Sequence, residues 1–67
     1  MQKIMFELND NVKVKYDKFE GEESLYIGLE GVVEDVDVND YNETVYGLRI
    51  EGYEDLLYFL AVELELI

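Results

Sequence analysis

The sequence predicts a small all-β domain, a barrel or sandwich of about five short strands. Apolar and polar residues alternate with a period of two in several short segments, which is the pattern of strands with one buried face. Turn-forming residues separate these segments at intervals of about 8–12 residues, as in small barrels and sandwiches. Apolar residues make up 49 % of the chain and aromatic residues 13 %, more than disordered acidic chains contain. We therefore expect one folded domain over residues 1–67.

The first strand follows a turn. Asn9–Asn11 is rich in turn-forming residues, and residues 12–16 then alternate between apolar and charged side chains. This alternation predicts a strand with one face toward the core. Gly21–Gly28 predicts the loop that leads to the next strand.

The second strand is predicted to be long and irregular. Leu29–Val38 is rich in valine, which favours a strand, but its alternation slips near Glu34. The slip predicts a β-bulge beside Gly31. Asn39–Asn42 follows as a hairpin connection, because asparagine and aspartate tolerate the left-handed backbone region.

The second half of the chain predicts the remaining strands. Thr44–Ile50 alternates regularly, and Glu51–Glu54 predicts a tight hairpin after it. Asp55–Leu60 is apolar on both faces, so we expect a central, doubly covered strand or a barrel strand. A short 3₁₀ turn over residues 60–62 leads to a last strand over residues 62–67. That strand is expected at an edge, where it would support a homodimer.

A helix is the alternative prediction for the C-terminus. The leucine spacing over Glu54–Leu66 fits one face of a helix. However, this segment has no clear helix cap, and Tyr58 and Phe59 favour a strand. The turn and strand are therefore preferred.

Four stretches give the chain a resemblance to small SH3-like barrels of the KOW-like kind found in bacterial and phage proteins: Asn9–Val14, Gly28–Val33, Tyr46–Ile50 and Leu57–Glu65. In that family the first stretch opens the first strand. The pattern Gly-x-x-Gly-x-Val, here Gly28–Val33, marks the bulged second strand. An ending of Phe-x-x-x-Glu-Leu, here Phe59–Leu64, supplies the 3₁₀ turn and the last strand. The resemblance implies an SH3-like barrel of five strands.

Composition excludes several classes of function. The chain has no Cys, His, Pro or Trp, which excludes disulfides, Cys/His zinc sites and Ser-His or Cys-His nucleophiles. It carries 17 acidic and 5 basic residues, a formal net charge of −12. Direct nucleic-acid binding needs clustered Lys and Arg, and anionic lipid repels an acidic surface. We therefore expect neither a nucleic acid nor a membrane as partner. KOW-like domains that bind RNA are often basic, and this acidic chain departs from them.

The negative charge is concentrated in one part of the chain. Residues 1–18 carry four lysines, Lys3 among them, and three acids, a net charge of +1, whereas residues 19–67 carry Arg49 and 14 acids, a net charge of −13. Six acids and no base fall between residues 30 and 43: Glu30, Glu34, Asp35, Asp37, Asp40 and Glu43. Alternate residues on a strand lie about 6.6 Å apart on one face. Asp35 and Asp37 should therefore stand side by side, and Arg49 should pair with a carboxylate on a neighbouring strand.

A fixed row of carboxylates imitates a row of phosphates. A protein that binds DNA through Lys and Arg would meet such a row as it meets a nucleic-acid backbone. In size, acidity and lack of catalytic residues the chain resembles small phage proteins that mimic DNA. That resemblance implies a non-enzymatic inhibitor of a host histone-like nucleoid protein, polymerase or defence nuclease. The partner-binding surface is expected to combine the six acids with four further residues: Tyr41, Tyr53, Glu54 and Asp55.

Three other interpretations stay open. The acidic face could simply keep the protein soluble, although a charge of −12 exceeds the usual magnitude of about 2–8 for a small domain. The chain could instead be an SH3-like adaptor that binds a peptide through its loop aromatics Tyr26, Tyr41 and Tyr53. It could also be a structural subunit of a larger assembly.

Metal binding, catalysis and export are not expected. Asp35-x-Asp37-x-Asn39 begins like an EF-hand loop, but the positions that need glycine and glutamate hold Asp40 and Tyr46. Carboxylate catalysis needs a cleft, and a domain this small is expected to lack one of about 300 Å³ or more. We therefore expect no metal, no cofactor and no enzymatic activity. The N-terminal residues lack the apolar core of a secretory signal, so the cytoplasm is the expected compartment.

Overall fold

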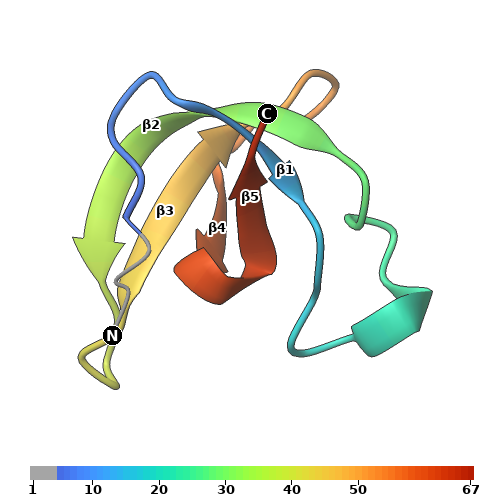
Figure 1. Cartoon of the computed structure of the whole chain (residues 1–67), viewed down its shortest axis with the longest axis horizontal. Coiled ribbons are helices and arrows are strands. Elements are labelled where there is room, and N and C mark those ends of the chain that lie inside the picture. Colours follow the sequence, from blue (N-terminus) through green and yellow to red (C-terminus); the bar gives the residue numbers. More distant parts are fainter. Residues whose placement is uncertain (1–4) are drawn as a thin grey trace.

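The computed structural model describes residues 5–67 and shows an all-β protein with a single five-stranded antiparallel sheet. The strands are β1 (Asn11–Val14), β2 (Glu30–Val38), β3 (Thr44–Arg49), β4 (Leu57–Leu60) and β5 (Leu64–Leu66). Two 3₁₀ turns accompany them, η1 (Gly21–Glu23) and η2 (Ala61–Glu63). The predicted small all-β class is confirmed (Figure 1).

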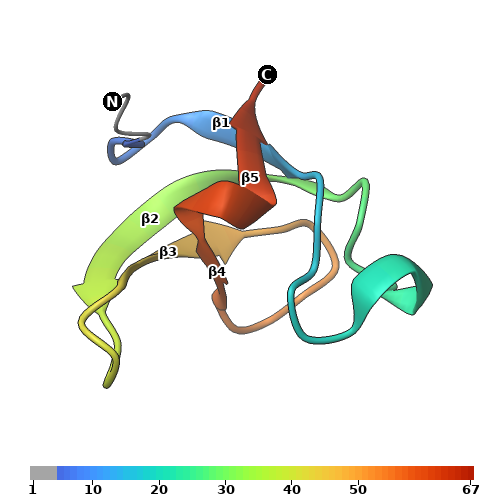
Figure 2. The same ribbon diagram turned by 60° about the horizontal axis from the view of Figure 1, so that its bottom comes forward.

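The sheet bends strongly because its two edges are joined by a short turn. The strand order is β4-β3-β2-β1-β5, so β4 and β5 are the edge strands. Only the three residues of η2 connect them. The sheet therefore has to curl until its edges approach one another, and Figure 2 shows β4 and β5 meeting at this turn. β5 is an edge strand, as expected from the sequence.

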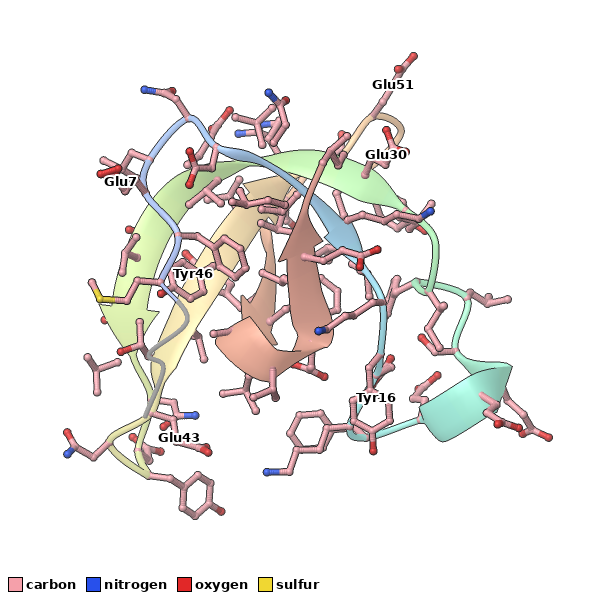
Figure 3. All side chains as sticks on the ribbon, in the orientation of Figure 1. Glu7, Tyr16, Glu30, Glu43, Tyr46 and Glu51 are labelled. Carbon is pink, nitrogen blue, oxygen red and sulfur yellow. The ribbon has the colours of Figure 1, made fainter. Side chains whose placement is uncertain are left out.

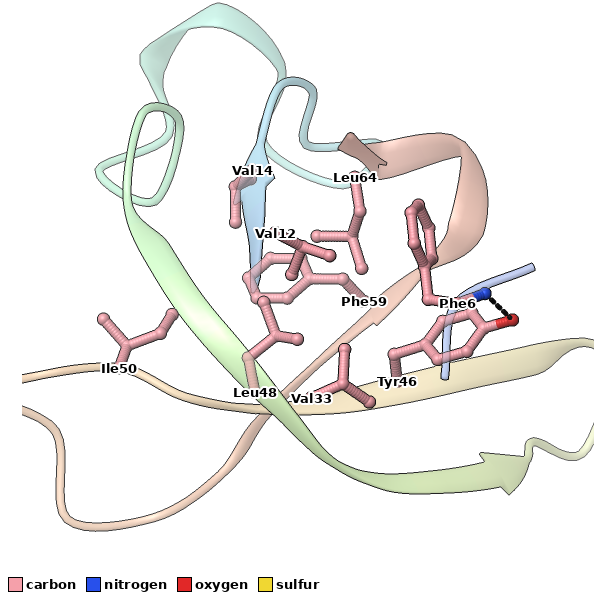
Figure 4. Close-up of a cluster of buried hydrophobic side chains, with 9 residues drawn as sticks. All are labelled: Phe6, Val12, Val14, Val33, Tyr46, Leu48, Ile50, Phe59 and Leu64. Carbon is pink, nitrogen blue, oxygen red and sulfur yellow. Dashed lines mark hydrogen bonds between the residues drawn. The ribbon is translucent and has the colours of Figure 1, made fainter. Parts of the chain in front are cut away.

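The hydrophobic core lies on the inner side of the curled sheet (Figure 4). Its fully buried side chains come from four strands and include Val12, Val33, Leu48 and Leu64. Leu48 lies opposite Val33 in the β2–β3 register, so their side chains meet on the same face. Outside the sheet, Phe6 packs edge-on against Tyr46, and its backbone N–H donates a hydrogen bond of 3.3 Å to the tyrosine hydroxyl.

A bulge is present in β2 as predicted, but it lies at Glu34, where the alternation slips, and not beside Gly31. Val33 pairs with Leu48 and Asp35 pairs with Gly47, so two residues of β2 advance against one residue of β3. The extra residue reverses the inward and outward alternation after this point. Without it Asp35 would share the inner face with Val33, whereas here it lies on the outer face.

The β2–β3 hairpin is braced by Asn39, as the turn-rich sequence predicts. Its side-chain oxygen accepts hydrogen bonds of 2.9 Å from the backbone N–H groups of both Tyr41 and Glu43. Asn42 adopts a left-handed backbone with φ 62°, which asparagine tolerates. The hairpin therefore holds its tip in one conformation.

Of the two alternatives predicted for Asp55–Leu60, the central, doubly covered strand is wrong. β4 begins only at Leu57 and lies at the edge of the sheet, with Tyr58 half exposed. The expected tight turn exists, because Tyr53 N–H bonds to the Ile50 carbonyl and Gly52 has φ 93°. Strand pairing nevertheless starts only at the pair formed by Leu48 and Leu57. The intervening residues form a loop, and on the outer face of β4 Tyr58 is exposed whereas Leu60 is buried.

The C-terminal helix, the alternative prediction, is absent. Residues 57–60 pair with β3, and Ala61–Glu63 form the 3₁₀ turn one residue later than predicted. The predicted loop at Gly21–Gly28 also contains a 3₁₀ turn, η1. Within residues 5–67 no helix is long and apolar enough to cross a membrane.

Candidate partner-binding surface

Asp35 and Asp37 share the outer face of β2. Asp35 lies opposite Gly47 and Asp37 lies opposite Val45, whereas Val36 between them lies opposite the buried Tyr46. The two carboxylates are therefore neighbours on one face of the strand, as the sequence predicts. The bulge produces this arrangement because it places both of them outside the core.

Tyr58 extends across β3 to reach Asp35. Its hydroxyl donates a hydrogen bond of 2.6 Å to Asp35 Oδ2. Gly47 lies between the two residues in the sheet, and a Cβ there would come within 2.8 Å of the Tyr58 ring. Because Gly47 has no side chain, the Tyr58 ring has room to lie beside it on the outer face. The hydrogen bond to Asp35 is the main cause that raises the pKa of Tyr58 above its ordinary value of 10.0.

Glu34 is not a free anion, because Arg49 pairs with it. Arg49 Nη2 lies 3.3 Å from Glu34 Oε1, on the neighbouring strand as predicted. Arg49 Nη1 also donates a hydrogen bond of 3.0 Å to the backbone carbonyl of Glu54. Among the residues that the structure describes, this is the single ion pair. The partially neutralised Glu34 contributes less to an acidic surface than Asp35 or Asp37.

The other predicted site residues are distributed around the molecule. Glu30 begins β2 opposite Lys13, and Asp40 is exposed in the β2–β3 hairpin. Figure 3 shows Glu43 at one end of the molecule, and Glu30 and Glu51 at the other. The structure therefore brings Asp35 and Asp37 together, near the hairpin, and leaves Glu30 apart from them. Lys3 lies outside the described residues.

The predicted aromatic and acidic residues of the β3–β4 connection lie at separate places. Tyr53 packs edge-on against Tyr26, with ring centroids 6.2 Å apart, and Tyr26 packs in turn on the core residue Phe59. Glu54 and Asp55 are exposed in the loop before β4. Tyr53 thus supports the base of the long β1–β2 loop, whereas Tyr41 is 83 % exposed at the hairpin.

An open groove lies between the β1–β2 loop and the β2–β3 hairpin. Its volume is about 490 Å³, larger than the sequence led us to expect for so small a domain. It is lined by Lys18, Phe19, Asn39, Tyr41, Glu43, Val45, Tyr58, Leu60 and Glu63. Three of these side chains are exposed aromatic rings, namely Phe19, Tyr41 and Tyr58. A second groove of about 530 Å³ shares Lys18, Glu43 and Leu60 with the first.

Two buried carboxylates fix the β1–β2 loop at the groove. Asp17, 4 % exposed, accepts hydrogen bonds from the Ser24 hydroxyl at 2.5 Å and from the backbone N–H groups of Phe19 and Glu20. The Ser24 bond is the largest cause that lowers the pKa of Asp17 below its ordinary value of 3.8, and it outweighs the opposing effect of burial. The loop conformation that places Phe19 therefore depends on a charged Asp17.

Glu63 provides the second anchor. Its carboxylate is 2 % exposed, and it accepts the N–H of Leu60 at 2.7 Å and that of Lys18 at 2.8 Å. The backbone carbonyl of Glu63 also accepts hydrogen bonds from Lys15 and Tyr16. Glu63 thus ties η2 to the start of the loop, across 45 residues of sequence.

The acidic residues do not converge on a point. Among residues 5–67 no three Asp or Glu side chains are placed to hold a metal ion. Asp35, Asp37 and Asn39, which begin an EF-hand-like pattern, lie along β2 and its hairpin and not in a calcium loop. The arrangement presents carboxylates outward along a rigid sheet, which suits a contact with another macromolecule.

Three comparisons, with protein-family models, with curated proteins and with solved structures, found no match.

Sequence reasoning missed the partnership of Gly47 and Tyr58. The sequence signal was Gly47 itself, because a glycine inside a regular strand pattern often marks the close approach of another group. The contact between Tyr58 and Asp35 could not be read from the sequence, because it depends on the order of three strands. Phe19, which lines the groove, is 85 % exposed.

Proposed function

We propose that the protein is a non-catalytic inhibitor that acts in the cytoplasm and binds a cationic nucleic-acid-binding protein as a mimic of DNA. The observation that supports this most directly is the pair of carboxylates on the outer face of β2. Asp35 and Asp37 lie about 6.6 Å apart along the strand, and Asp40 continues the negative charge into the hairpin. A binding surface of this kind needs no cofactor and no catalytic residue.

The charge balance supports the same proposal. The chain has a net charge of −12, and the described residues 5–67 form one ion pair. Most carboxylates are therefore compensated by solvent counterions. A partner that replaces these counterions with Lys and Arg side chains gains free energy from their release, as proteins do when they bind DNA.

The experiment is a pull-down of proteins from bacterial lysate, followed by competition with duplex DNA. A DNA mimic captures DNA-binding proteins, loses them steeply as salt rises and releases them to duplex DNA. The variant with Asp35→Asn, Asp37→Asn and Asp40→Asn should bind about tenfold or more weakly, because these carboxylates carry the contact.

The matched control removes the same charge elsewhere. Glu22, Glu23 and Glu51 are exposed and lie away from the outer face of β2, so their triple replacement by Gln also changes the net charge by three. If both triple variants weaken binding equally, only the net charge matters. If captured proteins are indifferent to duplex DNA, the mimic proposal is refuted.

The groove favours a second candidate function, the binding of an extended peptide. Its three exposed aromatic rings offer apolar contact area of the kind that peptide-binding domains use. A peptide held in this way would depend on Tyr41 and Phe19 and would tolerate salt. Phe19→Ala distinguishes the two functions, because Phe19 lines the groove but is not part of the acidic surface. The variant should abolish peptide capture while it leaves charge-driven binding nearly unchanged.

A further inference from the structure

The ring of Tyr58 lies on the outer face of the sheet, beside Gly47. It rests on Gly47, where a Cβ would come within 2.8 Å of Tyr58 Cε2 and 2.9 Å of Cζ. Tyr58 is 48 % exposed, so part of its ring is open to solvent. Tyr58 also lines the aromatic groove. The sheet therefore presents an exposed aromatic ring whose hydroxyl is held by Asp35.

Two carboxylates adjoin this ring, and each has one oxygen left over. Asp35 Oδ2 accepts the Tyr58 hydroxyl, and Asp37 Oδ1 accepts the backbone N–H of Val38 at 2.8 Å. Within residues 5–67 no donor is hydrogen-bonded to Asp35 Oδ1 or Asp37 Oδ2. Because the first oxygen of each is engaged, the orientation of the second is restricted.

Among residues 5–67, no cation is hydrogen-bonded or ion-paired to Asp35 or Asp37. Arg49 is held by Glu34 and by the Glu54 carbonyl, on the other side of the bulge. Lys18 lines the groove without an ion pair to any described carboxylate. In the described part of the chain, an exposed aromatic ring beside two outward carboxylates thus has negative potential and no paired counter-charge.

We infer that this position receives an arginine side chain of the partner, whose guanidinium stacks on Tyr58 while its N–H groups bond to Asp35 and Asp37. The inference rests on the proposed function, since it specifies one contact within that surface. A guanidinium is planar, stacks on aromatic rings and donates in a fork that fits carboxylates. A lysine ammonium is compact and strongly hydrated, so it gains less from the ring. The site therefore prefers arginine to lysine.

The probes are hexa-arginine and hexa-lysine peptides, which carry equal charge. Each is titrated into the full chain at fixed salt, with backbone amide shifts of β2, β3 and β4 as the readout. Hexa-arginine should bind about three- to tenfold more tightly than hexa-lysine, as one stacked and bidentate contact implies. Tyr58→Leu should remove this preference while hexa-lysine binding changes little. Asp35→Asn should weaken the binding of both peptides, and that of hexa-arginine more than that of hexa-lysine.

Tyr16→Leu is the matched control. Tyr16 is 49 % exposed, almost the same as Tyr58, but its side chain lines neither groove. This variant should keep the full preference for arginine. Tyr58→Phe keeps the ring and removes only the hydroxyl, so it separates the effect of stacking from the effect of orienting Asp35. It also replaces Tyr58→Leu as the test if the leucine variant folds poorly.

The outcomes separate this inference from the proposed function. Equal binding of the two peptides, absence of binding by both, or a preference that survives Tyr58→Leu overturns the arginine site. The proposed function then still stands if captured DNA-binding proteins are released by duplex DNA. Conversely, an arginine preference that depends on Tyr58 establishes the site even if no captured protein competes with DNA.

Discussion

The hydroxyl of Tyr58 on β4 donates a 2.6 Å hydrogen bond to Asp35 on β2, although β3 lies between the two strands. The contact is possible because Gly47 on β3 has no side chain in its path. It connects an edge strand to the centre of the sheet on the face that is open to solvent. The same contact defines the orientation of the candidate partner-binding carboxylate.

Replacement of Gly47 by alanine tests this relationship. The new Cβ would lie 2.8 Å from the Tyr58 ring and 3.2 Å from Asp35 Cβ, so the ring has to move away from this position. We expect Gly47→Ala to lower the free energy of unfolding by about 1–3 kcal/mol, measured by urea denaturation. In a Tyr58→Ala background the same substitution should cost much less, because the principal clash is gone. An equal loss of unfolding free energy in both backgrounds would show that the Tyr58 ring does not lie against Gly47.

The Tyr58 hydrogen bond also predicts a loss of stability at alkaline pH. Asp35 raises the pKa of Tyr58 in the folded state above the ordinary value of 10.0, so the folded state favours the protonated hydroxyl. The stabilisation is complete below pH 10 and is lost as the pH rises from there through the folded-state pKa. The difference in unfolding free energy between the parent and Tyr58→Phe should therefore shrink above pH 10. A difference that stays constant with pH would contradict the hydrogen bond.

The sequence predicted local features well because they depend on neighbouring residues. The bulge at Glu34 and the hairpin at Asn39–Asn42 follow from broken alternation and from turn residues. The placement of β4 at an edge could not be predicted, since an apolar strand pattern does not reveal how many neighbours it has. The contact between Tyr58 and Asp35 was missed for the same reason: it depends on the order of three strands.

Glu63→Gln should release the β1–β2 loop from η2. The two carboxylate oxygens accept one N–H each, from Leu60 and Lys18, and glutamine offers only one acceptor oxygen. One buried N–H then faces an NH₂ group, which should cost about 1–3 kcal/mol. Hydrogen exchange at the Leu60 or Lys18 amide should accelerate. The exposed neighbour Glu65 provides the control, because Glu65→Gln should leave both amides protected.

Acid should weaken the loop through Asp17. Its folded-state pKa is lowered below 3.8, chiefly by the Ser24 hydroxyl, so its stabilising contribution is present above that pH and is lost as the pH falls through the folded-state pKa. Ser24→Ala should cost about 1–3 kcal/mol at pH 7, the value of a hydrogen bond to a charged group. The cost should decrease as the pH falls below 3.8 and through the folded-state pKa of Asp17, where the parent also loses the charge. Thr44→Ala, which removes an exposed hydroxyl, should show neither effect.

Salt should stabilise the folded protein. A net charge of −12 is confined to a molecule of about 31 × 25 × 24 Å, so repulsion between carboxylates opposes the compact state. At 0.1 M ionic strength the screening length is about 10 Å, so charges on opposite faces of the molecule hardly repel one another. Neighbouring carboxylates on β2, about 6.6 Å apart, still do. The melting temperature should therefore rise with added NaCl, most steeply at low salt. The variant with Asp35→Asn, Asp37→Asn and Asp40→Asn should show a smaller rise than a variant in which three exposed acids that are not sequence neighbours, Glu7, Glu51 and Glu65, are replaced by Gln, because it removes adjacent charges. Equal salt dependence of the two variants would mean that the carboxylates of β2 are no closer to one another than those elsewhere.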